Sequence, residues 1–375
     1  MRFVVIAVLC AFTAGGCSRA TPTRVDDSGA GAGADANVSL RARAELALAR
    51  ARVPALAYAT VGRDAEDVGA VGLADVAQKR VASGDTVLEA ASIAKLVVAT
   101  CVMQLVDEGK LDLDIDASKY VGFTLRHPRF AEPITLRMLL AHRASIRDVD
   151  DELGARREQG NLLGSFLKKY LTRDAAFTVD RPGTKVAYSN VGASVAALAV
   201  EHVAGEGFAS FSTKRVFVPL RMSATAWAVP EPVPLSFATP YAFRGGAFVA
   251  LPAPSHAVYP AVDLHSSAHD LARFARAMLR DGELDGTRIL SAASSKAMLR
   301  GDGDAPIGWQ TRVIGGRNVV GHEGEDAGAS TALFLDLAAG TGAVVLANGD
   351  AFGSGDKPRA DAIQTMITEL LANPR

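Results

Sequence analysis

The order of secondary-structure patterns along this chain limits its fold more than any other feature. A helical stretch that Pro54 ends is followed by two strand-like stretches, ALAYATV and EDVGAVGLAD. The region from Ser92 to about Leu299 is mainly helical with long loops. Strand patterns return in IGWQTRVI, RNVVGHEG, ASTALFLDLA and GAVVLAN, and a helix with one apolar stripe follows them.

Strands near both ends and helices between them predict a mixed α/β fold of the α+β type. The simplest arrangement is an antiparallel sheet formed by both termini, with the terminal helices packed on one face. A mostly helical lobe, at about residues 92–299, is then inserted between the strands. We expect the functional site where the sheet meets this lobe.

Size, charge and cysteine content exclude some classes of function. The chain has 375 residues, which is enough for a large core, and 49% of them are hydrophobic. Its 40 basic and 41 acidic residues leave a net charge of -1, so we expect no nucleic-acid partner. The three cysteines form neither a disulfide framework nor a metal pair, and we interpret Cys101 as a small buried hydrophobe. We expect no cofactor and no metal.

The N-terminus is typical of an export signal. MR is a short basic start, and FVVIAVLCAFTA is apolar but short for a membrane span. TAGGC resembles a bacterial lipobox, which predicts a signal peptide at residues 1–16 and a lipidated Cys17; an ordinary cleaved signal is the alternative. Residues 17–37 predict a flexible tether ahead of a domain at 38–375. We therefore expect an exported protein of the cell envelope, held to a bacterial membrane by a lipid.

A Ser-x-x-Lys motif at Ser92 and Lys95 opens a strongly apolar helix. Residues three apart share a helix face, so Lys95 could take the proton of Ser92 and make it a nucleophile. The alternative is that Lys95 extends along the helix and places its charge in water. The motif occurs again at Ser165/Lys168 and Ser354/Lys357. Those copies lie in a charged helix and in a loop, so only Ser92 has a buried setting.

Two further motifs follow Ser92 along the chain. Tyr188 begins the only Y-x-N, which ends at Asn190, and His322 begins the only H-x-G, which ends at Gly324. In this order the three motifs resemble those of the serine β-lactamase and penicillin-binding-protein superfamily, and the chain looks closest to its class C-like branch. The likeness runs from about residue 40 to the C-terminus and includes LVDEGKLDLD, ITLRMLLAHRAS and PGTKVAYSNVG.

The resemblance implies a role for each residue of the first two motifs. Ser92 would be the acylated nucleophile, Lys95 its helix partner, Tyr188 the proton shuttle and Asn190 the amide that holds the substrate. The backbone N–H groups of Ser92 and Glu325 would form the oxyanion hole. Taken alone, Tyr188 could equally be a buried aromatic residue with a satisfied hydroxyl group.

The third motif would supply the strand beside the substrate. His322 takes the place that a lysine fills in other branches, and Gly324 would lie against the substrate. Free lysine and tyrosine titrate near 10, so either can act as a base at neutral pH only if its pKa is lowered. Burial should lower the pKa of Lys95, and cations close by should lower that of Tyr188. His322 alone could be structural, and we interpret His142 as structural.

Glu323 marks a difference from the β-lactamases and DD-peptidases that the chain resembles. They usually carry Thr or Ser there, and the hydroxyl group helps to bind the substrate carboxylate. The carboxylates of Glu323 and of such a substrate, ~4 Å apart, would repel each other by about 4 kcal/mol at an effective dielectric of 20. Even a third of this energy would weaken substrate binding about tenfold. Penicillins are therefore expected to be poorer substrates than neutral or cationic esters and amides. The alternative is that an arginine such as Arg143 pairs with Glu323.

Three functions follow from these motifs. The first is a serine hydrolase that forms a Ser92 acyl-enzyme with small esters or amides, as an esterase or peptidase does. The second is a β-lactamase or a DD-carboxypeptidase with a cell-wall-like peptide as partner. The third is a non-catalytic envelope lipoprotein that uses the fold to bind, because a fold does not guarantee a function. The sequence indicates no oligomeric state.

Overall fold

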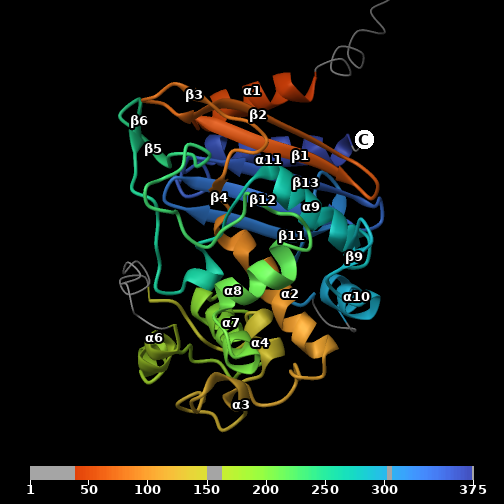
Figure 1. Ribbon diagram of the computed structural model, residues 1–375. Coiled ribbons are helices and arrows are strands. Elements are labelled where there is room, and N and C mark those ends of the chain that lie inside the picture. Colours follow the sequence, from red (N-terminus) through yellow and green to blue (C-terminus); the bar gives the residue numbers. More distant parts are fainter. Residues whose placement is uncertain (1–38, 150–162, 302–305, 374–375) are drawn as a thin grey trace, which may run out of the picture. The chain divides into compact units, whose positions relative to one another are not determined.

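The computed structural model describes residues 39–149, 163–301 and 306–373 (Figure 1). The predicted signal peptide, Cys17 and the tether lie outside the described residues. Their processing and lipidation therefore stay predictions.

The strand-like stretches from both termini meet in one seven-stranded sheet, in the order β10-β11-β12-β13-β1-β2-β3. Every neighbouring pair in it is antiparallel. Its strands are β1 Ala55–Gly62, β2 Glu66–Asp75, β3 Arg80–Val81, β10 Gln310–Ile314, β11 Arg317–Asp326, β12 Ala329–Asp336 and β13 Thr341–Ala347. N-terminal β1 lies beside C-terminal β13, with Leu56 opposite Ala347. The predicted sheet is confirmed.

The other strands pair in short two-stranded sheets. They are β4 Leu88–Glu89 with β7 His265–Ser266, β5 Tyr241–Arg244 with β6 Ala247–Ala250, and β8 Glu283–Leu284 with β9 Thr287–Arg288. The α-helices are α1 Leu40–Ala51, α2 Ala94–Asp107, α3 Ser118–Val121, α4 Leu136–Leu140, α6 Leu163–Tyr170, α7 Asn190–Ala204, α8 Phe208–Ser212, α9 Ala268–Leu279, α10 Ala292–Arg300 and α11 Lys357–Ala372. Shorter turns are η2 Ala91–Ile93, η3 Asp174–Ala176, η4 Thr213–Phe217 and η5 Tyr259–Ala261. Within the described ranges, no helix combines the length and the apolar character that a membrane crossing requires.

Helices cover both faces of the seven-stranded sheet. Side chains alternate along a strand, so β1 serves two cores. Leu56 and Tyr58 join the apolar cluster of α1 and α11, whereas Ala57 and Ala59 join the cluster that contains α2 and α9. The terminal helices α1 and α11 pack against each other on one face, as predicted (Figure 1).

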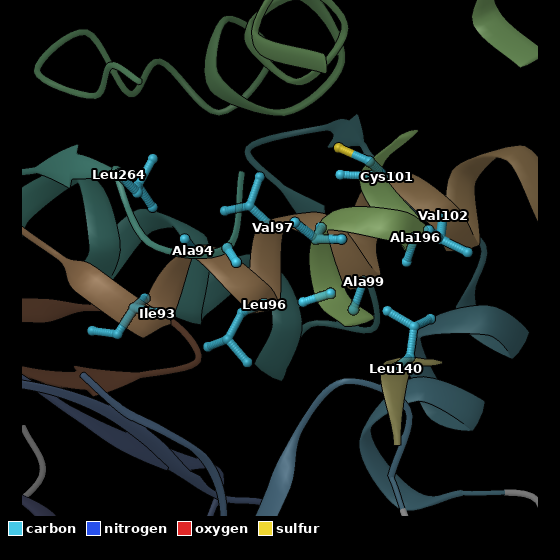
Figure 2. Close-up of a cluster of buried hydrophobic side chains, with 14 of the residues drawn as sticks. Ile93, Ala94, Leu96, Val97, Ala99, Cys101, Val102, Leu140, Ala196 and Leu264 are labelled. Carbon is cyan, nitrogen blue, oxygen red and sulfur yellow. The ribbon is translucent and has the colours of Figure 1, made fainter. Parts of the chain in front are cut away.

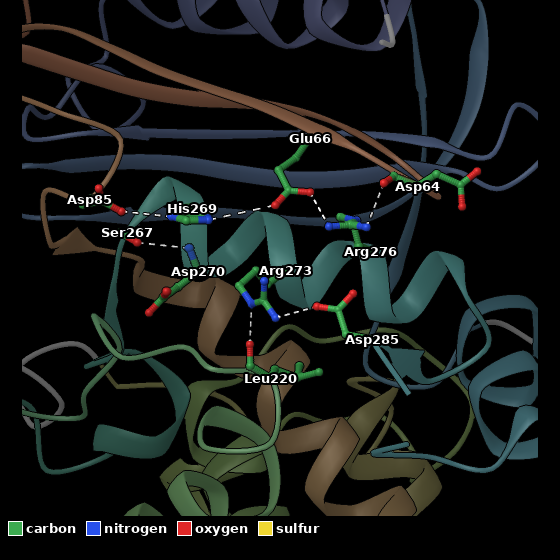
Figure 3. A network of polar contacts seen from close by, with 10 residues as sticks. All are labelled: Asp64, Glu66, Asp85, Leu220, Ser267, His269, Asp270, Arg273, Arg276 and Asp285. Carbon is green, nitrogen blue, oxygen red and sulfur yellow. Dashed lines mark hydrogen bonds and ion pairs between the residues drawn. The ribbon is translucent and has the colours of Figure 1, made fainter. Parts of the chain in front are cut away.

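Helix α9 covers the opposite face, where it packs on β1 and β13. Ser267 caps its N-terminus by accepting a hydrogen bond from the Asp270 backbone N–H. Arg276 pairs with Glu66 at the start of β2, which ties the helix to the sheet (Figure 3). Helix α9 thus belongs to the sheet layer, although α10, which follows it, packs against α2 in the helical lobe.

The helical lobe is built around α2, which packs against α7. Every residue from Ala94 to Leu105 is buried, so no face of this part of α2 is in water. Figure 2 shows the apolar side chains that surround it, among them Leu140, Ala196 and Leu264. Cys101 is buried in this core, as predicted. A charged residue here loses its hydration, which decides the behaviour of Lys95.

Candidate active site

Ser92 lies in the short turn η2, and Lys95 is the second residue of α2. Both side chains are buried, with 8% and 3% of their surfaces exposed. Ala91, directly before Ser92, has a φ of 47°, a left-handed conformation that residues with a side chain rarely adopt. The backbone is therefore strained where it presents Ser92.

The amino group of Lys95 lies at the centre of the site. Its Nζ atom is 2.9 Å from the Ser92 Oγ atom, 2.7 Å from the Asn190 Oδ1 atom and 2.8 Å from the Ala261 carbonyl oxygen. The last two atoms can only accept hydrogen bonds. A neutral amine gives its two N–H groups to them and turns its lone pair toward the Ser92 hydroxyl group. This is the arrangement of a base and a nucleophile.

Burial makes this neutral form accessible at physiological pH. It lowers the pKa of Lys95 to about 7, although the negative charges of Asp148 and Asp326 act in the opposite direction. The expected lowering is confirmed. The alternative, a lysine with its charge in water, is wrong because the whole side chain lies inside the protein.

Tyr188 brings a proton donor to the same oxygen atom. Its hydroxyl group donates a hydrogen bond of 2.8 Å to the Ser92 Oγ atom, while 43% of its surface is open to the cleft. Burial of the hydroxyl end raises the pKa of Tyr188, so the phenol keeps its proton at neutral pH. The expected lowering of this pKa is wrong. In the free enzyme Tyr188 is therefore a proton donor.

His322 explains why no cation acts on Tyr188 from that side. Burial first, and the charge of Lys95 second, lower the pKa of His322 to about 3, so the ring is neutral. The Glu323 carbonyl oxygen accepts the proton of Nδ1, and Nε2 accepts a hydrogen bond of 3.1 Å from the Gln310 amide group. The ring centroid is 5.9 Å from that of Tyr188. His322 thus contacts the catalytic group as a neutral ring with both nitrogens occupied.

Strand β11 lies close to the turn that carries Ser92. A Cβ atom at Gly324 would be 2.8 Å from the Ala90 carbonyl oxygen and 2.2 Å from the Thr331 Oγ1 atom, so only glycine fits there. The Thr331 hydroxyl group donates to the same carbonyl oxygen at 2.9 Å. Strand β11 therefore approaches the segment that leads into Ser92 at Ala90, and the oxyanion hole of Ser92 and Glu325 stays a prediction.

Asp148 is a site residue that the sequence analysis missed. Its carboxylate accepts hydrogen bonds from the Ser189 hydroxyl group at 2.8 Å and from the Asn190 backbone N–H at 2.7 Å. It thus holds the start of α7, where a negative charge is favourable. A carboxylate after the LLAHRAS stretch was the only signal, and it does not show that Asp148 contacts a motif 41 residues later.

His142 supports Tyr188 from the other side. The two ring centroids are 4.4 Å apart, and the His142 Nδ1 atom accepts a hydrogen bond of 3.2 Å from the Ser189 backbone N–H. Burial, with the nearby charge of Lys95, lowers the pKa of His142 to about 3. Its role is to hold Tyr188 in place, which agrees with the structural interpretation.

All three motifs face one cleft of about 990 Å³. Its lining includes Ser92, Tyr188, Asn190, His322, Glu323, Gly324 and Glu325. Lys95 lies behind Ser92, where substrate cannot reach it. The other two Ser-x-x-Lys copies are outside this cleft: Ser165 and Lys168 are exposed within α6, and Lys357 pairs with Asp361 at the start of α11.

Glu323 lines the cleft but has partners other than the one proposed. It accepts a hydrogen bond from the Gln364 amide group, and its Oε2 atom is 3.8 Å from the Arg312 guanidinium group. An arginine does pair with Glu323, as the alternative suggested, but it is Arg312; Arg143 lines a separate hollow. The Arg312 pair is half exposed, so solvent weakens it. The carboxylate of Glu323 is therefore only partly compensated.

A sheet formed by both ends of the chain, with a buried Ser-Lys pair, a tyrosine hydroxyl and a glycine-tight strand around one cleft, defines the serine β-lactamase and penicillin-binding-protein superfamily. The chain belongs to the Beta-lactamase family, whose sequence profile matches residues 40–365. The family is one of serine hydrolases and acyltransferases.

Known relatives are similar over most of the chain. Penicillin-binding protein 4 of Amycolatopsis lactamdurans is 29% identical over 71% of this chain and 73% of its own length. Protein flp of Staphylococcus aureus strain N315 is 25% identical, and the match covers 74% of this chain and 56% of that protein.

Solved structures share the fold. The octameric penicillin-binding protein homologue from Pyrococcus abyssi has a TM-score of 0.75 and 22% identity, covering 89% of this chain and 77% of its own. D-alanine carboxypeptidase AmpC from Burkholderia cenocepacia has a TM-score of 0.69 and 21% identity, covering 88% and 99%.

Proposed function

We propose that this protein is a serine hydrolase that acts through a Ser92 acyl-enzyme on small ester or amide substrates. The observation that carries the proposal is the pair of contacts at the Ser92 Oγ atom: Lys95 at 2.9 Å and Tyr188 at 2.8 Å. One partner can accept the serine proton, and the other can donate a proton. Membership of the Beta-lactamase family supports the same chemistry.

The proposed reaction has two halves. The Ser92 Oγ atom attacks the substrate carbonyl carbon as its proton passes to neutral Lys95. The oxyanion receives hydrogen bonds from the backbone N–H groups of Ser92 and Glu325, and one such donor typically contributes ~10²–10³ in rate. The carbonyl carbon then loses its alcohol or amine, which takes a proton from Tyr188. In the second half, a water molecule attacks the acyl carbon and gives one proton to the Tyr188 phenolate. The Ser92 Oγ atom then leaves and takes its proton back from Lys95, which restores all three groups.

A panel of neutral aryl esters, neutral amides and a fluorescent penicillin tests this function. We expect ester turnover, together with a stable mass increase when a fluorophosphonate modifies the protein. Reaction with none of these substrates and probes would favour the non-catalytic envelope protein instead. The matched control is Ser165→Ala, because Ser165 belongs to a second Ser-x-x-Lys motif that is exposed on α6.

A β-lactamase or a DD-carboxypeptidase is the second candidate. The name of Penicillin-binding protein 4, the relative at 29% identity, favours it. The charge of Glu323 in the cleft counts against it, because both substrate classes carry a carboxylate. Faster acylation by penicillin than by a neutral ester would select this candidate.

We also propose that the mature protein is a lipoprotein of the bacterial cell envelope, anchored through Cys17. The proposal is supported by the lipobox-like TAGGC and the tether-like composition of residues 17–37. Intact-mass analysis of the N-terminal peptide should show a lipid, and Cys17→Ser should release the protein or leave it unprocessed. An N-terminal peptide without lipid mass contradicts the anchor.

A further inference from the structure

A cluster of acidic and histidine side chains, with Glu89 and Asp263 buried and His256 and Asp326 partly buried, lies next to active-site backbone segments. Glu89 is 7% exposed, and within the described part of the chain no hydrogen-bond donor reaches either of its carboxyl oxygens. Its carboxyl group contacts that of Asp326. Burial first, and the negative charge of Asp326 second, raise the pKa of Glu89 well above its usual value. Glu89 is therefore the carboxyl group of the pair that keeps a proton.

His256 continues the cluster on the other side of Asp326. Its Nε2 atom is 3.4 Å from the Asp326 Oδ2 atom, and its Nδ1 atom is 2.6 Å from the Asp263 Oδ1 atom. The Asp263 Oδ2 atom also accepts the His256 backbone N–H at 2.8 Å. Burial acts to lower the pKa of His256, but the hydrogen bond to Asp263 and the two negative charges outweigh it and raise the pKa. The imidazolium ion thus lies between two carboxylates.

Neither a metal-binding arrangement of side chains nor a charged His265 accompanies the cluster in the described part of the chain. No group of three or more His, Cys, Asp or Glu side chains among the described residues is arranged to hold a metal ion. Burial is the main cause that lowers the pKa of His265, which pairs with Glu89 across β4 and β7, so this ring is neutral.

Each member of the cluster is joined to a backbone segment that the proposed reaction uses. Glu89 lies three residues before Ser92, and Asp326 directly follows Glu325 on β11. Asp263 lies two residues after Ala261, whose carbonyl oxygen accepts a hydrogen bond from Lys95.

We propose that Glu89, Asp326, His256 and Asp263 form one proton-sharing cluster that positions these three backbone segments and sets the negative charge that Lys95 experiences. They are positioning residues, since none touches the cleft. The inference rests on the proposed function in one respect, namely that neutral Lys95 is the base.

The cluster acts on Lys95 through Asp326, whose charge opposes the fall of the Lys95 pKa that burial causes. Asp148 acts in the same direction. The remaining groups that face Lys95 are the neutral rings of His142 and His322 and the protonated phenol of Tyr188.

The test measures the acylation rate by a neutral aryl ester against pH, in wild type and in two variants. Asp326→Asn removes a negative charge and should lower the midpoint of the acidic limb by about half a unit. His256→Gln removes a positive charge and should raise it by about the same amount. If Asp326 and His256 had only a structural role, the two variants would not shift the midpoint of the acidic limb in opposite directions.

Two controls separate charge from damage to the fold. Glu89→Gln replaces a neutral donor by a neutral donor and should leave the midpoint in place. Asp336→Asn removes a buried carboxylate that pairs with Arg317 on another part of the sheet, and should also leave it in place. Equal midpoints in Asp326→Asn, His256→Gln and wild type, or shifts in one direction, overturn the proposal.

A readout without turnover distinguishes this failure from failure of the proposed function. The His256 imidazole signal, followed by NMR, should titrate above the usual value of about 6.5 in wild type and move down in Asp326→Asn. If the wild type shows this titration but no ester turnover, the result contradicts only the proposed hydrolase function. Titration of His256 at its ordinary value overturns the cluster, whatever the activity.

Discussion

The Lys95 Nζ atom lies 2.9 Å from the Ser92 Oγ atom in a helix whose first twelve residues are all buried. Burial takes the ammonium ion out of water and lowers its pKa to about 7. We predict that the acylation rate rises with pH around a midpoint near 7, because the neutral amine is the active form. Measurement of the acylation rate by a neutral aryl ester between pH 5 and pH 9 checks this.

Lys95→Ala is expected to lower the acylation rate by ~10²–10⁴ and to remove this pH dependence. The matching stability test uses Lys95→Met. The unfolded chain keeps the lysine proton up to about 10.5, so stability of the wild type should rise with pH from about 7 to 10.5. Lys95→Met lacks this titration, so its melting temperature should exceed that of the wild type most clearly at pH 6. A difference that does not narrow by pH 9 contradicts the lowered pKa.

Tyr188→Phe should slow acylation by about 10²-fold or more, because the phenol is the proton donor at the leaving group. The ring still packs on His142, so the melting temperature should stay unchanged. The measurement compares an amide with an activated aryl ester, whose leaving group needs little help from an acid. The acylation rate should fall further with the amide than with the activated ester. Equal losses for both substrates would mean that Tyr188 does not protonate the leaving group.

Asp148→Asn should lower the midpoint of the acidic limb, because the charge of Asp148 raises the pKa of Lys95. Asp148→Ala should in addition cost about 0.5–2 kcal/mol of stability, since the carboxylate holds the first turn of α7. Thermal unfolding and the pH profile measure the two effects separately. Asp114→Asn, which removes an exposed carboxylate of the same lobe, should leave the midpoint unchanged. A shift in that control equal to the one in Asp148→Asn would rule out a local effect.

Glu323→Thr should raise kcat/KM for penicillin relative to a neutral aryl ester by about three- to tenfold, because it removes the negative charge from the cleft. The gain is limited by Arg312, which already compensates part of that charge at 3.8 Å. Arg312→Gln is the opposite control and should lower the same ratio. A wild type that already prefers penicillin, or a ratio that neither substitution changes, contradicts this account of selectivity.

Patterns along the chain were sufficient for the architecture. Short, almost continuously apolar stretches such as ALAYATV and GAVVLAN, together with the helical middle, predicted the shared sheet, and β1 does pair with β13. The position of α9 on the sheet could not be predicted, because α9 has the same local pattern whether it packs on helices or on the sheet. Only its tertiary contacts decide that.

Motifs predicted the residues around Ser92 but not their electrostatics. Proton positions depend on what surrounds each group in three dimensions, so the pKa of Tyr188 moved opposite to expectation. Asp148 and the partners of Glu323 come from segments far away in sequence, and short-range spacing contains no information about them. Glu89 and His256 were also missed, because both meet Asp326, which lies far from them in sequence on β11.

The most direct test of the central claim is peptide mapping after covalent labelling with a fluorophosphonate, with the ester panel run in parallel on Ser92→Ala. The account predicts a single modified serine, Ser92, and loss of both label and turnover in the Ser92→Ala variant. A label on Ser165 or Ser354, or turnover that persists in Ser92→Ala, would contradict it.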